Sequence, residues 1–288
     1  MSQHSVFVLS CEGTPLTPTT PARARHLLQA GVVRPVWSRL GTFGIRLLGP
    51  TRRHQPRTGL GVDHGAVAEG YAVVCGTENV LAVKLDLPDK AQIVRKLEQR
   101  RSLRRARRAR KLRRRPQRCQ NRRHPAGWIA PSQRALVLAH EKMLTTLGRM
   151  YPLTVAGVEE VCFDHRRHRW GARFSTVEIG KERLRQWYQD HGINARFYRG
   201  FETEAVRTEY GYTNSSDKRA DRFSAHCTDA LALAALVTTG ARVETGPWLI
   251  VDETYRPVRR QLHDTQPGKG GCVRPTVAAP SGACARDC

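Results

Sequence analysis

The chain has 288 residues, 40% of them hydrophobic, a formal net charge of +24 at pH 7 and a pI near 10.8. This length can bury one substantial core plus a small extra module, and so large a positive charge predicts nucleic acid or another anionic surface as partner. No run of about 18 apolar residues occurs and the N-terminus lacks the features of a signal peptide, so we expect no membrane span and a cytoplasmic location.

Residues 1–50 predict a small α+β module. Strands are expected at 5–9, 32–37 and 43–48, with a proline-containing turn at 13–18. A short helix is expected at 20–31, because Thr20 can cap it, Pro21 suits its first turn and Gly31 can end it. A plain structural subdomain is an equally good interpretation of this module.

Residues 51–88 begin a new core after a polar, basic linker. A strand is expected from Gly59 to Asp63, followed at hairpin spacing by strands at 70–75 and 80–84. A carboxylate at the end of the first of three antiparallel strands could hold a metal ion. An aspartate that forms a turn or caps a helix is as common at such a position.

Residues 89–125 carry the most concentrated charge of the chain. The stretch 95–123 holds sixteen Lys and Arg residues and one acid, Glu98. The residue types favour a helix over about 89–115, which Pro116 would stop. Arginine dominates, which suits forked contacts to phosphate and stacking on bases, whereas a disordered tail or localisation signal is the alternative. The predicted nucleic-acid-binding residues are Arg101, Arg104, Arg105, Arg107, Arg108, Arg110, Lys111, Arg113 and Arg114.

Residues 126–250 continue the core. We expect Ser132 to cap a helix that runs to about Met150, followed by a strongly apolar strand at 153–162. Glu159 and Glu160 interrupt this strand, and neighbours on a strand face opposite sides. One of them should therefore point inward, where a carboxylate needs a metal ion or a cation.

The second half of this region carries a basic loop at 163–173, a helix at 181–191, a strand at 193–198 and an apolar helix at 223–239. The last helix is interrupted by His226 and Asp229, whose spacing of three places them on one face. A hydrogen-bonded His–Asp pair inside the core is the structural alternative.

Residues 251–288 predict a basic and then irregular tail, which we expect to be disordered. The eight cysteines form no CxxC pair and are not spaced with histidines as in a zinc finger, so we expect them to be reduced.

Asp63, Glu159, His226 and Asp229 together form a set that suits phosphodiester hydrolysis. Two Mg²⁺ ions, with Mn²⁺ as an alternative, would bind the carboxylate oxygens of Asp63, Glu159 and Asp229. A neutral imidazole beside them could accept a proton from the attacking water.

Ordered motifs along the chain resemble the transposon-encoded, RNA-guided nucleases of the IscB and IsrB group. Pro15-Leu-Thr-Pro18 resembles the PLMP signature of their N-terminal module, and Arg104-Arg-Ala-Arg-Arg108 resembles the RRxRR signature of their bridge helix. The stretches around Asp63, Glu159 and His226-Cys-Thr-Asp229 resemble the three RuvC segments, and the RRQLH and KGG stretches of the tail also match.

This resemblance implies an α/β fold with an RNase H-like (RuvC) core, a mixed sheet and an Arg-rich bridge helix. It implies Asp63, Glu159 and Asp229 as metal ligands, His226 as general base, and an endonuclease that nicks the displaced DNA strand. The implied partners are a guide RNA of the omega type and target DNA, in a monomeric ribonucleoprotein at the prokaryotic nucleoid.

Three departures from that pattern stand out. The short interval between Glu159 and His226 holds no HNH-like motif, which favours the IsrB-like branch and a single cut strand. The tail lacks the family's C-terminal module, from which we expect a truncation or frameshift. His64 stands where the family usually has proline, beside the predicted ligand Asp63.

Two other functions stay open at this point. A decayed transposon protein would bind guide RNA without cutting DNA. An unguided, structure-selective nuclease of the Holliday-junction type would cut branched DNA without RNA, although the long arginine helix argues against it.

Overall fold

The computed structural model describes residues 5–51, 55–65, 67–109, 127–160, 176–217 and 220–253. The basic loop at 163–173, the tail beyond 253 and most of the arginine stretch beyond 109 lie outside these residues. None of the helices in the described part of the chain is long and apolar enough to cross a membrane.

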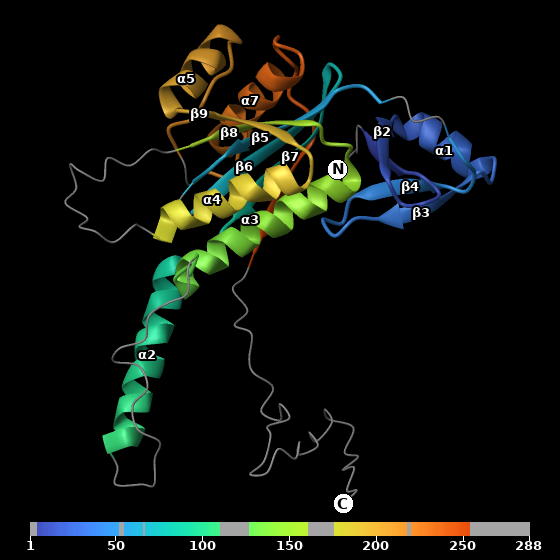
Figure 1. Ribbon diagram of the computed structural model, residues 1–288. Helices are drawn as coiled ribbons and strands as arrows, with labels where there is room; N and C mark the ends of the chain where they lie inside the picture. The colour runs from blue at the N-terminus through green and yellow to red at the C-terminus, as the bar shows by residue number, and fades with distance from the viewer. Residues whose placement is uncertain are drawn as a thin grey trace, which may run out of the picture. The chain divides into compact units, whose positions relative to one another are not determined.

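The N-terminal residues form a four-stranded sheet in the order β2-β1-β4-β3, with one helix, α1 (Figure 1). Thr20 caps α1 through its side chain, and Gly31 has a φ of 69°, both as predicted. The turn predicted at 13–18 is wrong, because most of it is the edge strand β2. Prolines are tolerated at an edge, where a missing N–H leaves no gap in the ladder. The elements are β1 (Val6–Leu9), β2 (Pro15–Thr19), α1 (Pro21–Gln29), β3 (Val33–Trp37) and β4 (Phe43–Leu47).

The larger sheet has six strands in the order β10-β7-β6-β5-β8-β9. Strands β5, β6 and β7 form an antiparallel meander, while β8 adds in parallel to the other side of β5 and β9 adds in parallel to β8. This order and these directions are those of an RNase H-like core, so the predicted fold class is confirmed. The strands are β5 (Thr58–Asp63), β6 (Ala68–Cys75), β7 (Glu78–Asp86), β8 (Val155–Glu159), β9 (Asn194–Tyr198) and β10 (Trp248–Asp252).

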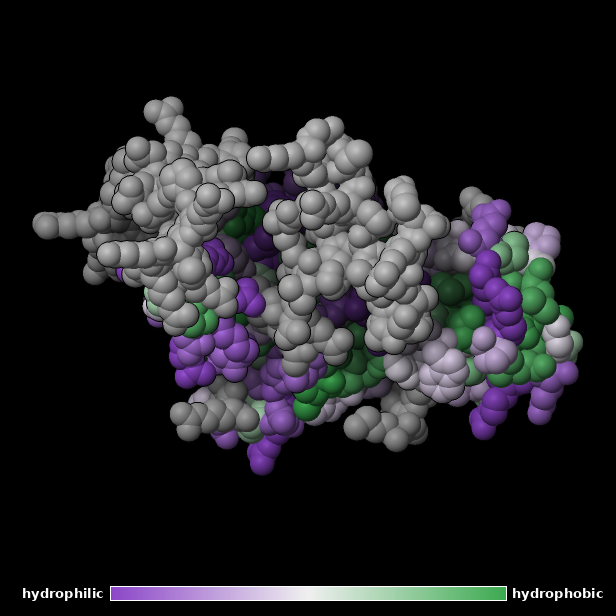
Figure 2. Space-filling model, turned by 90° about the horizontal axis from the view of Figure 1, so that it is seen from below, coloured by the Kyte–Doolittle hydropathy of each residue, from purple (hydrophilic) through white to green (hydrophobic). Residues whose placement is uncertain are grey.

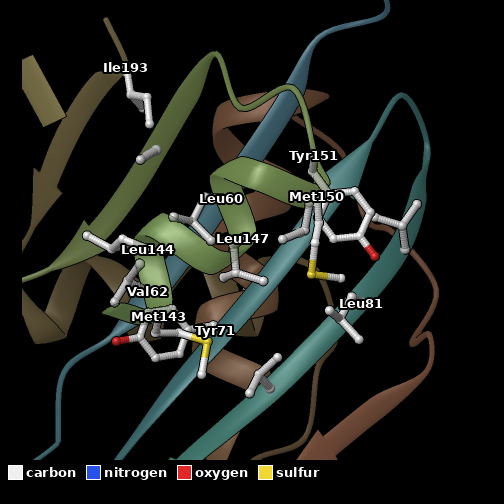
Figure 3. Close-up of a cluster of buried hydrophobic side chains, with 14 of the residues drawn as sticks. Leu60, Val62, Tyr71, Leu81, Met143, Leu144, Leu147, Met150, Tyr151 and Ile193 are labelled. Carbon is white, nitrogen blue, oxygen red and sulfur yellow. The ribbon is translucent and has the colours of Figure 1, made fainter. Parts of the chain in front are cut away.

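One face of this sheet is covered by α3 (Pro131–Met150), with α4 (Thr176–Asp190) beside it (Figure 1). Figure 3 shows Met143, Leu144 and Leu147 of α3 packed against the strands that carry Leu60 and Tyr71. Burying such side chains stabilises the fold by about 1.5–3 kcal/mol each. The predicted cap at Ser132 is wrong, because Pro131 occupies the first turn and Ala130 is the N-cap.

The opposite face is covered by α7 (Thr228–Thr238), which has α5 (Gly200–Glu209) on its outer side (Figure 1). The single helix predicted for 223–239 is wrong. It is split into α6 (Phe223–His226) and α7 at Cys227, whose φ of −111° and ψ of −8° depart from helical values. Apolar periodicity does not reveal this break, because every residue around it is compatible with a helix.

Glycines allow α7 to lie very close to the sheet. A Cβ added at Gly61 would come within 1.8 Å of the carbonyl oxygen of Ala230, and one at Gly70 within 1.9 Å of that of His226. Gly59 and Gly157 are similarly restricted by Thr238 and Leu233. The glycines of β5, β6 and β8 therefore fix the distance of α7 from the strand ends.

The arginine-rich helix α2 (Lys90–Ala109) is confirmed within the described part of the chain. Asp89 starts it by accepting a hydrogen bond from the backbone N–H of Gln92 at 3.0 Å, and Ile93, only 2% exposed, anchors its first turn. The six basic residues from Arg95 to Arg105 are all exposed. The helix thus presents its charge to solvent on all sides beyond its anchored first turn.

Candidate active site

A row of side chains crosses the sheet where β5 ends. Asp63 is paired with Gly70 of β6, and Gly70 is paired in turn with Lys84 of β7. Facing residues on neighbouring strands point to the same side. Asp63 and Lys84 therefore lie on the α7 face, separated by a glycine against which the carbonyl of His226 packs.

Glu159 lies at the end of β8, next to Asp63. The pairing of Val62 with Val158 places the following residues, Asp63 and Glu159, side by side at the end of the ladder. Burial raises the pKa of Glu159, and the charge of Asp229 adds to that rise, while a hydrogen bond from Thr203 opposes it. Neighbouring like charges of this kind are stabilised by a cation placed between them.

Asp229 is buried in the first turn of α7, where the helix N-terminus favours a carboxylate. Arg207 of α5 donates a hydrogen bond from Nη1 to its Oδ1 at 2.6 Å, and Asn214 donates one from Nδ2 to its Oδ2 at 2.8 Å. The guanidinium supplies part of the positive charge that the two neighbouring acids require.

His226 ends α6 and is half-buried. Its Nε2 lies 3.2 Å from the carbonyl oxygen of Ala220, which can only accept, so Nε2 carries a proton and donates it. In the neutral ring the lone pair is then on Nδ1, which is the atom that could take a proton from water.

Glu160, the residue that follows β8, is paired with a cation of its own. Glu160 accepts two hydrogen bonds from Nη2 of Arg185, at 2.7 and 2.6 Å. The two neighbours do diverge, because Glu159 interacts with Asp229 on the α7 side, whereas Glu160 is neutralised by α4.

The ends of β5 and β8 thus place Asp63 beside Glu159, and the charge of Asp229, in the first turn of α7, acts on Glu159. Three carboxylates from β5, β8 and α7 offer hard oxygen ligands, and their mutual repulsion would be relieved by divalent cations. Oxygen donors of this kind suit a hard divalent cation, although in this structure the three acids do not form a group whose ligand atoms all lie within 4.8 Å of one another. The helix break at Cys227 means that His226 and Asp229 are not on one continuous helix face, contrary to the prediction.

Sequence patterns missed Lys84, Arg207 and Asn214. Lys84 is 9% exposed at its side chain, and its Nζ lies 2.9 Å from Asp86 and 2.6 Å from Asp221. A lysine within an otherwise apolar strand was a visible signal for a buried charge. Arg207 lies on α5, a helix that carries no motif, so only the fold reveals its contact with Asp229.

The other side of the β5 end carries a second polar cluster. His64, Glu69, Tyr71 and His140 are hydrogen-bonded to one another beside a cavity of about 420 Å³. Burial alone would raise the pKa of Glu69, but the charge of His140 and hydrogen bonds from both histidines lower it strongly. Burial lowers the pKa of His140, and the neighbouring Glu69 opposes that shift.

Replacing Gly61 with alanine should destabilise the protein by about 2–4 kcal/mol, since the new methyl group would collide with backbone atoms of α7 that cannot rotate away. Thermal unfolding measures the effect. Gly148→Ala is the matched control, because nothing lies within 4 Å of a Cβ there and alanine favours the helix, so stability should stay or rise. Equal stability of the two variants would contradict the close packing of α7.

Replacing Arg207 with glutamine should make the thermal stability of the protein more dependent on divalent metal. In the absence of metal, the variant would lack the Arg207 guanidinium, which is the cation that Asp229 and Glu159 share. We therefore expect its free energy of unfolding in EDTA to fall by about 1–2 kcal/mol. Added Mg²⁺ should then raise the melting temperature more than in the unmutated protein. Arg183→Gln removes an exposed partner of Glu141 and is the control. An equal Mg²⁺ effect in both variants would show that metal does not bind these acids.

The described part of the face in Figure 2 mixes hydrophilic (purple) and hydrophobic (green) areas. Such a surface does not single out one kind of partner. The concentrated charge of α2 is therefore the stronger indication of what the protein binds.

Residues 6–179 match the model of a protein family described as RRXRR protein. None of the curated proteins compared with the chain matches it. Among solved structures, RuvC of T. thermophilus in complex with a Holliday junction substrate is similar at 12% identity and a TM-score of 0.35, over 62% of this chain and 90% of that one. A second structure of Thermus thermophilus RuvC has 14% identity and a TM-score of 0.30, with the same coverage. With TM-scores this low, the assignment of the fold rests on the strand order and directions.

Proposed function

The chain belongs to the RRXRR family, and we propose that it is a Mg²⁺-dependent endonuclease that nicks DNA under the direction of a guide RNA. The observation that supports this proposal is the position of Asp63 beside Glu159 at the ends of β5 and β8, with the charge of Asp229 acting on Glu159. The exposed arginines of α2 supply the second component, an extended surface for a polyanion.

Asp63, Glu159 and Asp229 would hold two Mg²⁺ ions, with Mn²⁺ as a substitute. Bound there, the ions would polarise the scissile phosphate and lower the pKa of the attacking water. Nδ1 of His226 would accept the proton of that water, while its Nε2–H bond to Ala220 keeps the ring oriented. Lys84 and Arg207 would balance the negative charge of the acids and the phosphate.

The arginine helix would contact the phosphates of a guide RNA and of its duplex with target DNA. Arginine binds phosphate through its shape and charge without reading sequence, so the base pairing of the guide would supply the specificity. We place Arg101, Arg104 and Arg105, all exposed on α2, in this contact.

The experiment that tests this function is a nicking assay on supercoiled plasmid with the ribonucleoprotein purified from cells. We expect an open-circle product only with Mg²⁺ and a target matching the guide. Guide-RNA binding without a nick would favour the decayed RNA-binding protein. Cutting of branched DNA without RNA would favour the unguided nuclease instead.

A further inference from the structure

The cluster of His64, Glu69 and His140 lies on three separate elements. His64 follows β5, Glu69 is in β6, and His140 is in the middle of α3, which packs over both strands. Nδ1 of His64 lies 3.1 Å from Oε1 of Glu69, and Nδ1 of His140 lies 3.0 Å from Oε2. The two rings lie beside each other, with centroids 4.4 Å apart.

These separations are close to those within a metal centre. One ligand atom from each of the three side chains lies within 4.8 Å of the other two. In a tetrahedral zinc site with bonds of about 2.0–2.1 Å, neighbouring ligand atoms are about 3.3 Å apart. The nitrogen–oxygen distances would therefore need to change by only a few tenths of an ångström.

On metal binding, Nδ1 of each histidine would bind the ion in place of its hydrogen bond to Glu69, and Nε2 would carry the remaining ring proton. His140 is 1% exposed, and its Nε2 finds no hydrogen-bond partner among the described residues. An unpaired buried imidazole nitrogen is costly, whereas a neutral imidazole is the form that binds metal. Tyr71 donates from its hydroxyl to Oε2 of Glu69 at 2.5 Å, as an outer partner would orient a ligating carboxylate.

A cavity of about 420 Å³ borders all three side chains. It provides room for a water molecule as a further ligand. Two imidazoles and one carboxylate with an open position form a ligand set that zinc favours, whereas magnesium favours oxygen ligands alone. The cluster and the three acids on the α7 face thus differ in the metal they would select.

We propose that His64, Glu69 and His140 form a binding site for a transition-metal ion of the zinc class. The ion would link α3 to the β5–β6 hairpin. It would lie close to Asp63, which directly precedes His64 in the chain. This site adjoins the carboxylate site, because Glu159 also borders the cavity and the charges of Asp63 and Glu159 act on His64. It uses a different set of ligands, and the proposal does not depend on the proposed nuclease activity.

The test is metal retention by the purified full chain. After incubation with Zn²⁺ and gel filtration, elemental analysis should find one equivalent of zinc. Substitution with Co²⁺ should give the visible absorption bands of a four- or five-coordinate ion with nitrogen ligands. His64→Gln and His140→Gln should each weaken zinc binding by about a hundredfold or more.

The matched controls are His26→Gln and His191→Gln, which remove exposed histidines elsewhere. They and Asp229→Asn, which alters the carboxylate site, should leave zinc binding unchanged. His64 is partly exposed, so its variant keeps the test valid if the His140 variant does not fold. No retained zinc, zinc retained equally by His64→Gln, or loss in a control variant would overturn the proposal.

Discussion

Replacing Asp63 with alanine should abolish Mg²⁺-dependent nicking while RNA binding persists. Asp63 ends β5 beside Glu159, and we propose that it is one of the carboxylates that hold the two ions. Losing a ligand from such a site removes several kcal/mol of transition-state stabilisation, and we expect the rate to fall by about a thousandfold or more.

The strand itself should survive this change. Asp63 is the last residue of β5 and is only half-buried, so alanine leaves the ladder with Gly70 intact. Nicking of a matched plasmid measures the rate, and filter binding measures the RNA affinity. Asp190→Ala, at an exposed position at the end of α4, is the control and should nick normally. Nicking by Asp63→Ala at the unmutated rate would disprove the assigned site.

Replacing Arg101, Arg104 and Arg105 with glutamine should weaken RNA binding and reduce its dependence on salt. Glutamine keeps the helix propensity of α2 and removes only charge. Each lost phosphate contact reduces the slope of log affinity against log salt by about 0.7–0.9, so the three changes should reduce it by about 2–3.

The expected change in the salt dependence of RNA binding comes from the position of these three arginines on α2 and not from net charge alone. Changing Arg34, Arg149 and Arg242 to glutamine removes the same charge from exposed positions scattered over the chain. Affinity measured at several salt concentrations should show a smaller change of slope for this control. Identical slopes for the two triple variants would remove α2 from the binding surface.

The sequence predicted the RNase H-like core well because its strongest local signals agree with the fold. The strand that ends at Asp63 and the two strands after it were predicted with nearly correct limits. The RRxRR motif agrees with the family match. The carboxylates were found because an acid in or beside an apolar strand or helix is a conspicuous exception.

What the sequence could not predict depends on contacts between distant residues. Arg207 reaches Asp229 only because α5 packs against α7, and Glu69 meets His140 only because α3 covers β6. The break at Cys227 was likewise not predicted, since the residues on both sides of it are compatible with a continuous helix. The catalytic roles of Asp63, Glu159, His226 and Asp229 stay predictions that the proposed variants test.

The measurement that tests the central proposal most directly is the identity of the RNA bound by the protein, followed by nicking of the matching target. The protein is expressed with the DNA that flanks its gene, and the RNA that co-purifies is sequenced. We predict one abundant structured RNA with a variable end, and Mg²⁺-dependent nicking of a plasmid that matches this end but not of a mismatched one. Heterogeneous RNA or none, or a plasmid cut regardless of its match, would contradict guided nicking.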